Sequence, residues 1–138
     1  MKNLLFRIVT GIAGFYHLVL GVGGLVLPSD TFVKVSSFIL GMSTDVDASS
    51  YLIVKFGAAY VMAFGIMLIL LCIDPVKNRI LMIPALSLFG VRLINKIIFF
   101  SAIGSAFEIT TGRNVFAILS LLFLIFAMLL TMPKKSVQ

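Results

Sequence analysis

Four long apolar runs dominate this sequence, and each is bounded by polar or helix-breaking residues. The runs cover residues 4–27, 51–73, 80–100 and 115–132. A helix of about 20 apolar residues crosses the hydrocarbon core of a bilayer, so each run is long enough to span it. Continuous runs indicate helices, because the strands of a membrane barrel alternate apolar and polar residues. The sequence therefore predicts an all-α fold, a single domain of four transmembrane helices in an up-and-down bundle.

The composition excludes a water-soluble domain. Hydrophobic residues make up 61% of the 138 residues and charged residues 12%, and the mean hydropathy is +1.20. About a quarter of the residues of a soluble domain are charged, so this chain lacks the polar surface to face water on all sides. We therefore expect a multi-pass integral membrane protein whose main partner is the lipid bilayer.

Positive charge is distributed unevenly between the two sides of the predicted bundle. The side with both termini and the 74–79 turn has six basic residues and one acidic residue, a net charge of +5. The other charges are five basic and four acidic residues, a net +1, which completes the total of +6. The positive-inside rule then places both termini in the cytoplasm, and we expect a bacterial cytoplasmic membrane. The basic residues lie singly along the membrane edge, so we do not expect nucleic-acid binding.

The longest connection covers residues 28–50, on the outer side of the predicted bundle. Ser29 or Asp30 can cap a short helix within it. An amphipathic helix there would lie in the membrane interface. We therefore expect a short outer interfacial helix whose apolar face consists of Phe32, Val35, Phe38 and Ile39.

Small residues line one face of the first predicted helix. Gly14, Gly21 and Gly24 recur with His17 at spacings of three or four residues, which places all four on the same face. Small residues let helices approach closely in lipid, so this face is expected to pack inward. His17 is then expected to point into the bundle.

Two ionisable residues are predicted to lie near the middle of the membrane. His17 and Arg92 fall within about 3 Å of their span centres, and Lys55 and Lys96 lie about 10 Å from theirs, toward the outer side. Asn95 shares the helix face of Arg92. Charged groups inside a membrane are costly and mark binding sites, ion paths or internal pairs. We therefore take these five residues as candidate ligand-binding residues.

Four of these residues also have a structural interpretation. Lys55 and Lys96 can extend to lipid phosphates, and His17 can serve as a hydrogen-bonding residue in helix packing. Arg92 can be neutralised by Glu108 or Asp45, or it can hold a ligand such as an anionic lipid, a quinone or a small anion. The near balance of the outer charges favours the internal pair.

The sequence contains no pattern typical of catalysis or of a metal site. No paired carboxylates lie in the predicted spans, no His or Cys cluster has metal-ligand spacing, and no nucleophile lies beside a base. The one cofactor alternative besides a quinone is a b-type haem held by His17 and a Met, which is chemically feasible but weakly supported. We therefore expect a non-catalytic protein with no metal and no cofactor.

The layout resembles the DoxX-like group of small four-helix membrane proteins. The matching features are the glycine-bearing first helix that ends at Pro28, Leu40-Gly41, the segment 56–60 that opens the second helix, Gly65, and Gly90-Val91-Arg92. Lys55 stands where an arginine is expected in that group. The resemblance implies only that Arg92 and Lys55 are candidate site residues. Separately, we expect Gly57 and Gly65 to take part in helix packing. Some members of the group look like membrane subunits of quinone-linked oxidoreductases.

The function we expect first is that of a small accessory subunit of a larger, redox- or quinone-linked membrane complex. Its partners would be other membrane protein chains or further copies of itself. The alternative is a binding module or transporter that holds an anionic lipid, a quinone or a small anion in an outer-half cationic pocket.

The charge asymmetry predicts the topology of the chain. A cysteine in place of Ser136 should react with a membrane-impermeant thiol reagent only after the cells are opened, whereas one in place of Ser43 should react in sealed cells. Labelling of the Ser136→Cys variant from outside sealed cells would reverse the assignment.

Overall fold

The computed structural model describes residues 2–28, 30–32, 34–35, 48–106 and 108–132. Its helices are α1 (Lys2–Val26), α3 (Ala48–Ile73), α4 (Met82–Ile98), α5 (Phe100–Ala106) and α6 (Thr111–Thr131), with the 3-10 turn η1 (Arg79–Leu81) before α4. No strand occurs in these ranges. Four of the helical segments are long and apolar enough to cross a membrane. The predicted all-α, four-helix fold is therefore confirmed.

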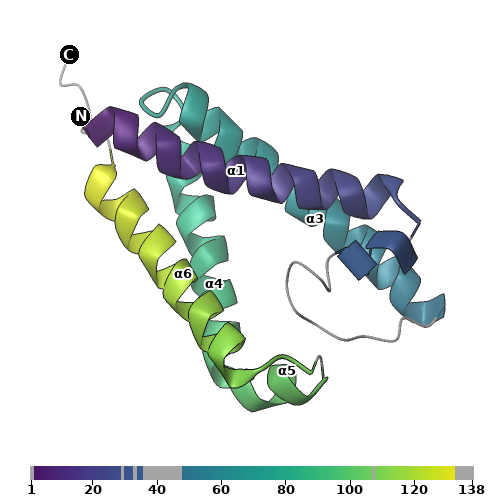
Figure 1. The fold of residues 1–138 in the computed structure, drawn as a ribbon. Coiled ribbons are helices and arrows are strands. Elements are labelled where there is room, and N and C mark those ends of the chain that lie inside the picture. Colours follow the sequence, from purple (N-terminus) through teal and green to yellow (C-terminus); the bar gives the residue numbers. More distant parts are fainter. Residues whose placement is uncertain (1, 29, 33, 36–47, 107, 133–138) are drawn as a thin grey trace.

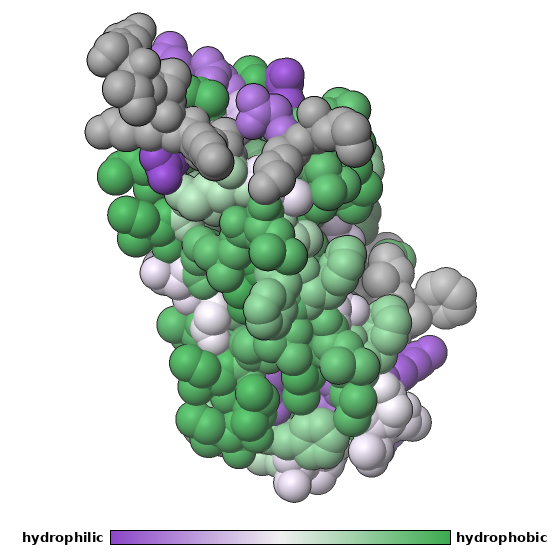
Figure 2. Space-filling model, turned by 90° about the vertical axis from the view of Figure 1, so that its left-hand side faces the viewer, coloured by the Kyte–Doolittle hydropathy of each residue, from purple (hydrophilic) through white to green (hydrophobic). Residues whose placement is uncertain are grey.

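The four long helices form two antiparallel pairs, α1 with α3 and α4 with α6 (Figure 1). The pairs meet near the end that carries the start of α1, the turn from α3 to α4, and the end of α6, and they diverge toward the opposite end (Figure 1). Hydrophobic residues cover the middle of the face shown in Figure 2, and hydrophilic residues gather near its top. This distribution suits a protein whose sides contact lipid.

The hydrophobic core lies where the two pairs meet. Buried side chains from all four long helices fill it, and Phe6, Leu68, Phe89 and Met128 are fully enclosed. On α4 the buried positions Met82, Ala85 and Phe89 recur every three or four residues and form one inward stripe. Arg92 is the next position on that stripe. The inward face of α4 therefore changes from apolar to charged where the pairs begin to diverge.

Glycines allow the backbones of α1 and α3 to approach closely. A Cβ atom at Gly21 would lie 2.5 Å from the Met62 Cα, and one at Gly24 would lie 2.5 Å from the Ala58 Cβ. A Cβ atom at Gly65 would lie 2.6 Å from the Leu18 backbone nitrogen. These distances are too short for any side chain. Gly14, which faces Ile69 at 3.0 Å, belongs to the same seam.

Gly57 does not belong to the seam. It is exposed, and a Cβ atom there would have no neighbour within 4 Å. The packing role that we predicted for Gly57 is therefore wrong. The reason is helical phase, because the neighbouring Ala58 is the residue that faces α1, against Gly24.

The outer connections contain more helix than the sequence predicted. α6 begins at Thr111, so Arg113 and Asn114 are helical and not part of a connection, and α5 follows α4 directly. The hydropathy pattern predicts where the apolar part of a span begins and ends. The helix itself can extend beyond that part into polar residues. Thr110 is the N-cap residue of α6, and its extended backbone (φ −62°, ψ 146°) marks the start of the helix.

The expected interfacial helix is seen in part. Residues 30–32 and 34–35 are helical, and the ring of Phe32 packs on Gly23 and Gly24 of α1. Phe38 and Ile39, which were expected to complete its apolar face, lie outside the described residues. So does Leu40-Gly41.

The glycine seam predicts opposite effects for two substitutions of the same type. Gly21→Ala should destabilise the protein by about 1–3 kcal/mol, because the new methyl group collides with backbone atoms of α3. Gly57→Ala should be neutral or slightly stabilising, since alanine favours a helix by about 0.5–1 kcal/mol over glycine. Thermal unfolding in the same detergent measures both effects. Equal loss of stability in the two variants would contradict the seam.

Candidate cationic site between α1 and α4

The structure brings two of the predicted site residues, His17 and Arg92, into direct contact. The Arg92 Nη1 lies 2.8 Å from the His17 Nε2, so a hydrogen bond joins α4 to α1. His17 lies on the buried face of α1 that also includes Phe6, Thr10 and Ala13. Arg92 follows the buried stripe of α4 on the same helix face, but its side chain is exposed. The pair therefore forms the last layer of contact before the helix pairs diverge.

The surroundings of His17 determine which nitrogen of its ring carries the proton. The side chain is 4% exposed, and its Nδ1 lies 2.7 Å from the Ala13 carbonyl oxygen, which can only accept. Arginine can only donate, so Nε2 must accept from it. The imidazole is therefore neutral with its proton on Nδ1. The rings of Phe64 (4.9 Å) and Phe89 (6.0 Å) lie edge-to-face with it.

This arrangement bears on the haem alternative. A haem iron would need a free ring nitrogen on His17, and both nitrogens are in hydrogen bonds. Iron could reach Nε2 only by displacing Arg92. Across the described residues, no three His, Cys, Asp or Glu side chains lie close enough to hold a metal ion.

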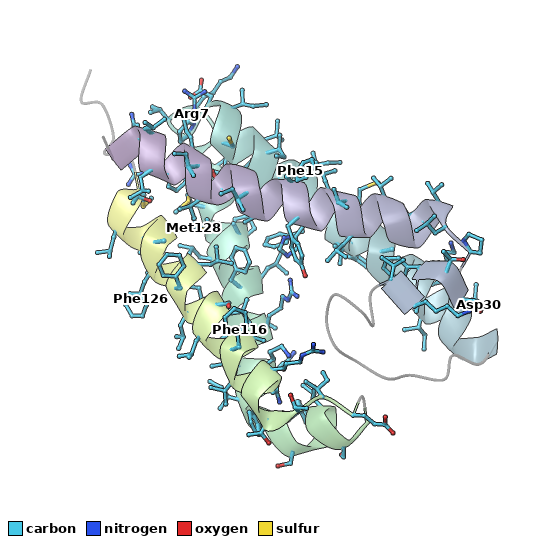
Figure 3. The ribbon with its side chains drawn as sticks, viewed as in Figure 1. Arg7, Phe15, Asp30, Phe116, Phe126 and Met128 are labelled. Carbon is cyan, nitrogen blue, oxygen red and sulfur yellow. The ribbon has the colours of Figure 1, made fainter. Side chains whose placement is uncertain are left out.

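Arg92 has one acceptor within the part of the chain that the structure describes, and that acceptor is His17 Nε2. The guanidinium has five N–H donors, so most of them have no acceptor among the described residues. The side chain keeps an exposed surface. In Figure 3, nitrogen-bearing side chains lie between α1 and the α4–α6 pair.

The predicted ion pair between Arg92 and Glu108 does not form. Glu108 lies in the connection between α5 and α6, exposed and with a left-handed backbone (φ 50°), and it makes no interaction with Arg92. The pairing was expected from charge balance alone, which does not show whether two side chains lie near each other. Asp45, the other expected partner, lies outside the described residues.

Lys96 and Asn95 extend the polar face of α4 toward its C-terminal end. The Lys96 Nζ donates to Asn114 Oδ1 at 3.3 Å, and the Asn114 Nδ2 donates to the Phe100 carbonyl at 3.1 Å. The Asn95 side chain is exposed and makes no hydrogen bond to a described residue. Lys96 is thus held on α6 by Asn114, which is 1% exposed.

Asn114 was missed from the sequence because it was expected in an outer connection. The signal for it is its place directly before an apolar run, where a polar side chain at the start of a transmembrane helix can face inward. Arg113, its neighbour, is exposed.

Lys55 takes part in a different interaction. Its Nζ donates to the carbonyl oxygens of Leu25 at 3.0 Å and Leu27 at 2.7 Å, at the end of α1. A cation there satisfies unpaired carbonyls and stabilises the negative end of the helix dipole. The sequence did not indicate this contact, since it depends on how α3 lies beside α1.

Arg7 makes the matching contact at the other end of the same pair. Its Nε and Nη2 donate to the carbonyl oxygens of Cys72 and Ile73, each at 2.7 Å. Each of the two antiparallel helices therefore carries a basic residue near its start that caps the end of its partner. The seam and these two contacts together fix α1 against α3.

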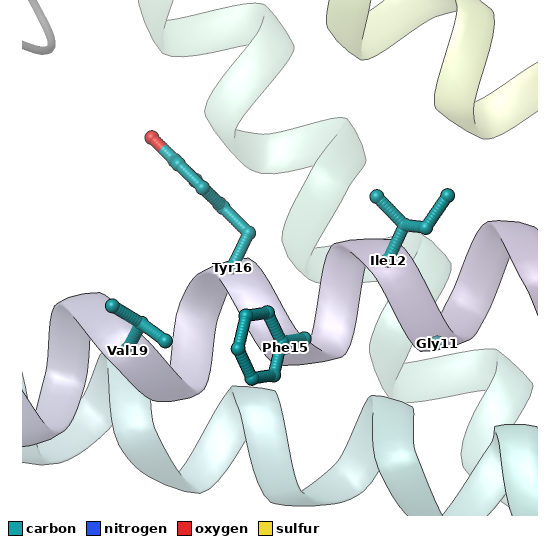
Figure 4. Close-up of a pocket in the computed structure, with 5 residues that line it drawn as sticks. All are labelled: Gly11, Ile12, Phe15, Tyr16 and Val19. Carbon is teal, nitrogen blue, oxygen red and sulfur yellow. The ribbon is translucent and has the colours of Figure 1, made fainter.

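A shallow apolar groove lies on α1 near the cationic site (Figure 4). It has a volume of about 420 Å³ and is lined by Gly11, Ile12, Phe15, Tyr16 and Val19. Its lining suits an acyl chain or a neighbouring helix. Tyr16 lines the groove and also neighbours the cationic site, because its ring lies 5.3 Å from that of His17. Its hydroxyl points away from α1 (Figure 4).

Comparison of the chain with protein-family models, curated proteins and solved structures gave no match. The resemblance to the DoxX-like group, and the roles it implies, therefore stay predictions. The functional argument depends on the geometry of the site.

The capping contact of Lys55 predicts a structural effect. Lys55→Met should lower the stability of the protein by about 0.5–1 kcal/mol, because two helix-end carbonyls lose their charged donor. Lys55→Arg should retain most of it. Thermal unfolding in detergent compares the two variants, and unchanged stability of Lys55→Met would show that the contact contributes nothing.

Proposed function

We propose that this protein is an integral membrane binding protein that holds an oxyanion at the site formed by His17, Arg92, Asn95 and Lys96. The shared chemistry is a phosphate-type group, carried by an anionic lipid or present as a free ion. The observation that carries the proposal is that the Arg92 guanidinium donates to a neutral imidazole and not to a carboxylate.

The unused hydrogen-bonding capacity of Arg92 supports this function. A charged group inside the membrane requires polar partners, since lipid tails supply none. The bond to His17 occupies one donor and neutralises no charge. Guanidinium groups match the geometry of phosphate and carboxylate oxygens, so an oxyanion meets both requirements.

A second cation nearby supports the same class of ligand. Lys96 follows Arg92 by one helical turn, about 6 Å along α4. Two like charges in one polar face favour an anion over a cation. A quinone can accept hydrogen bonds from Arg92 but carries no charge to balance these groups, so it fits less well.

Binding measurements on purified protein test the proposal. Nanodiscs of phosphatidylcholine are titrated with inorganic sulfate, and the lipid that copurifies in mild detergent is identified by native mass spectrometry. Arg92→Met should weaken anion binding by about 10–100-fold, the loss of one or two charge-assisted hydrogen bonds. Lys77→Met, which removes an exposed positive charge in the turn after α3, is the matched control and should bind as the unmodified chain does.

The two sources of anion give different results. Sulfate binding without a copurified anionic lipid indicates a free ion, and a retained anionic lipid that blocks sulfate indicates a lipid headgroup. If neither binds, and Asp45→Asn restores stability lost in Arg92→Met, an internal ion pair replaces the proposal.

The accessory-subunit role is a second candidate, and the groove on α1 is the feature that favours it. A ridge of side chains from another transmembrane helix fits a groove lined by Gly11 and Val19. Val19→Phe, at an exposed position of the groove, should then dissociate the complex without changing sulfate binding. Size-exclusion chromatography with light scattering measures the dissociation.

A further inference from the structure

The hydrogen bonds of His17 set the charge that the site can carry. Nδ1 donates to Ala13 and Nε2 accepts from Arg92. A proton on Nε2 would remove the only described acceptor of Arg92. It would also place two cations within hydrogen-bond distance of each other. The site without an anion therefore holds His17 neutral.

The groups around His17 offer no compensation for a second positive charge. It faces the phenol ring of Tyr16 on α1, Phe64 on α3, and Phe89 and Arg92 on α4. Lys96 adds a further cation one turn beyond Arg92. No carboxylate among the described residues contacts this group. On the proposed function, a ligand supplies the negative charge.

We infer that anion binding at the Arg92–His17 pair is coupled to the uptake of one proton by His17, an inference that rests on the proposed function. An anion that accepts from Arg92 takes the place of Nε2 as acceptor. Nε2 then takes up one proton from the bulk solution and keeps it, and the new N–H donates a hydrogen bond to the anion. No covalent bond changes apart from this proton transfer, and the site gains one negative and one positive charge.

The coupling has a physical advantage in a membrane. Loading a monovalent anion together with a proton leaves the net charge of the site unchanged, and charge changes are expensive where the dielectric constant is low. Linkage is reciprocal, so acid must strengthen anion binding as much as the anion strengthens proton binding. The affinity for an anion can rise by up to about tenfold for each unit of falling pH, the limit for one linked proton.

Calorimetry on the full chain in phosphatidylcholine nanodiscs tests this inference. Sulfate is the probe, because its charge stays constant between about pH 5.5 and 8. Titrations in two buffers of different ionisation enthalpy give the number of protons taken up. We expect uptake that approaches one proton per sulfate and an affinity that rises as the pH falls.

Two variants assign the proton. His17→Asn keeps an acceptor for Arg92 but cannot titrate, so it should bind sulfate with one affinity across the pH range. Tyr16→Phe removes the neighbouring phenol and should keep the pH dependence. Persistence of the pH dependence in His17→Asn would overturn the inference.

The two proposals fail in different ways. Equal affinities at pH 6 and pH 8 with no proton uptake would refute the coupling and leave the anion site in place. If neither sulfate nor the phosphatidylglycerol of nanodiscs binds to the protein at any pH, the anion site and the coupling are both refuted.

Discussion

An arginine inside the hydrocarbon layer needs acceptors, and the contact between the two helix pairs ends at the point where Arg92 finds one. On the side of that point nearer the start of α1 and the end of α6, the pairs share an apolar core. At that point the guanidinium donates to His17 across the interface. Beyond it, the pairs diverge (Figure 1). Asn95 and Lys96 follow Arg92 there and continue the polar part of α4. The hydrogen bond thus marks the boundary between a packed core and a polar site.

That contact is useful only if α1 holds His17 in a fixed place. The backbones of α1 and α3 touch at Gly21 and Gly65, so α1 cannot slide or turn without a clash. Arg7 and Lys55 add charged caps at the two ends of the same pair. These contacts make α1 and α3 a rigid support, against which Arg92 on α4 can be positioned.

The architecture could be predicted from the sequence, because hydropathy and helix length depend on local composition. The inward placement of His17 also followed from glycine spacing. The roles of the cations did not follow, since Lys55, Lys96 and Arg92 are all basic residues in apolar spans but meet different partners. Those partners are backbone carbonyls, Asn114 and His17, and each depends on how two helices lie beside each other. Spacing within one helix carries no such information.

The same dependence explains why charge balance misled the search for the partner of Arg92. Counting charges treats a cation as satisfied only by an anion, whereas a neutral imidazole can satisfy one donor and leave the charge in place. On the proposed function, this difference lets the protein fold without a ligand and still bind an anion. His17 supplies an acceptor while no anion is bound, and the uncompensated charges of Arg92 and Lys96 still attract one. A carboxylate in its place would neutralise the guanidinium permanently, and the ligand would then have to compete with it.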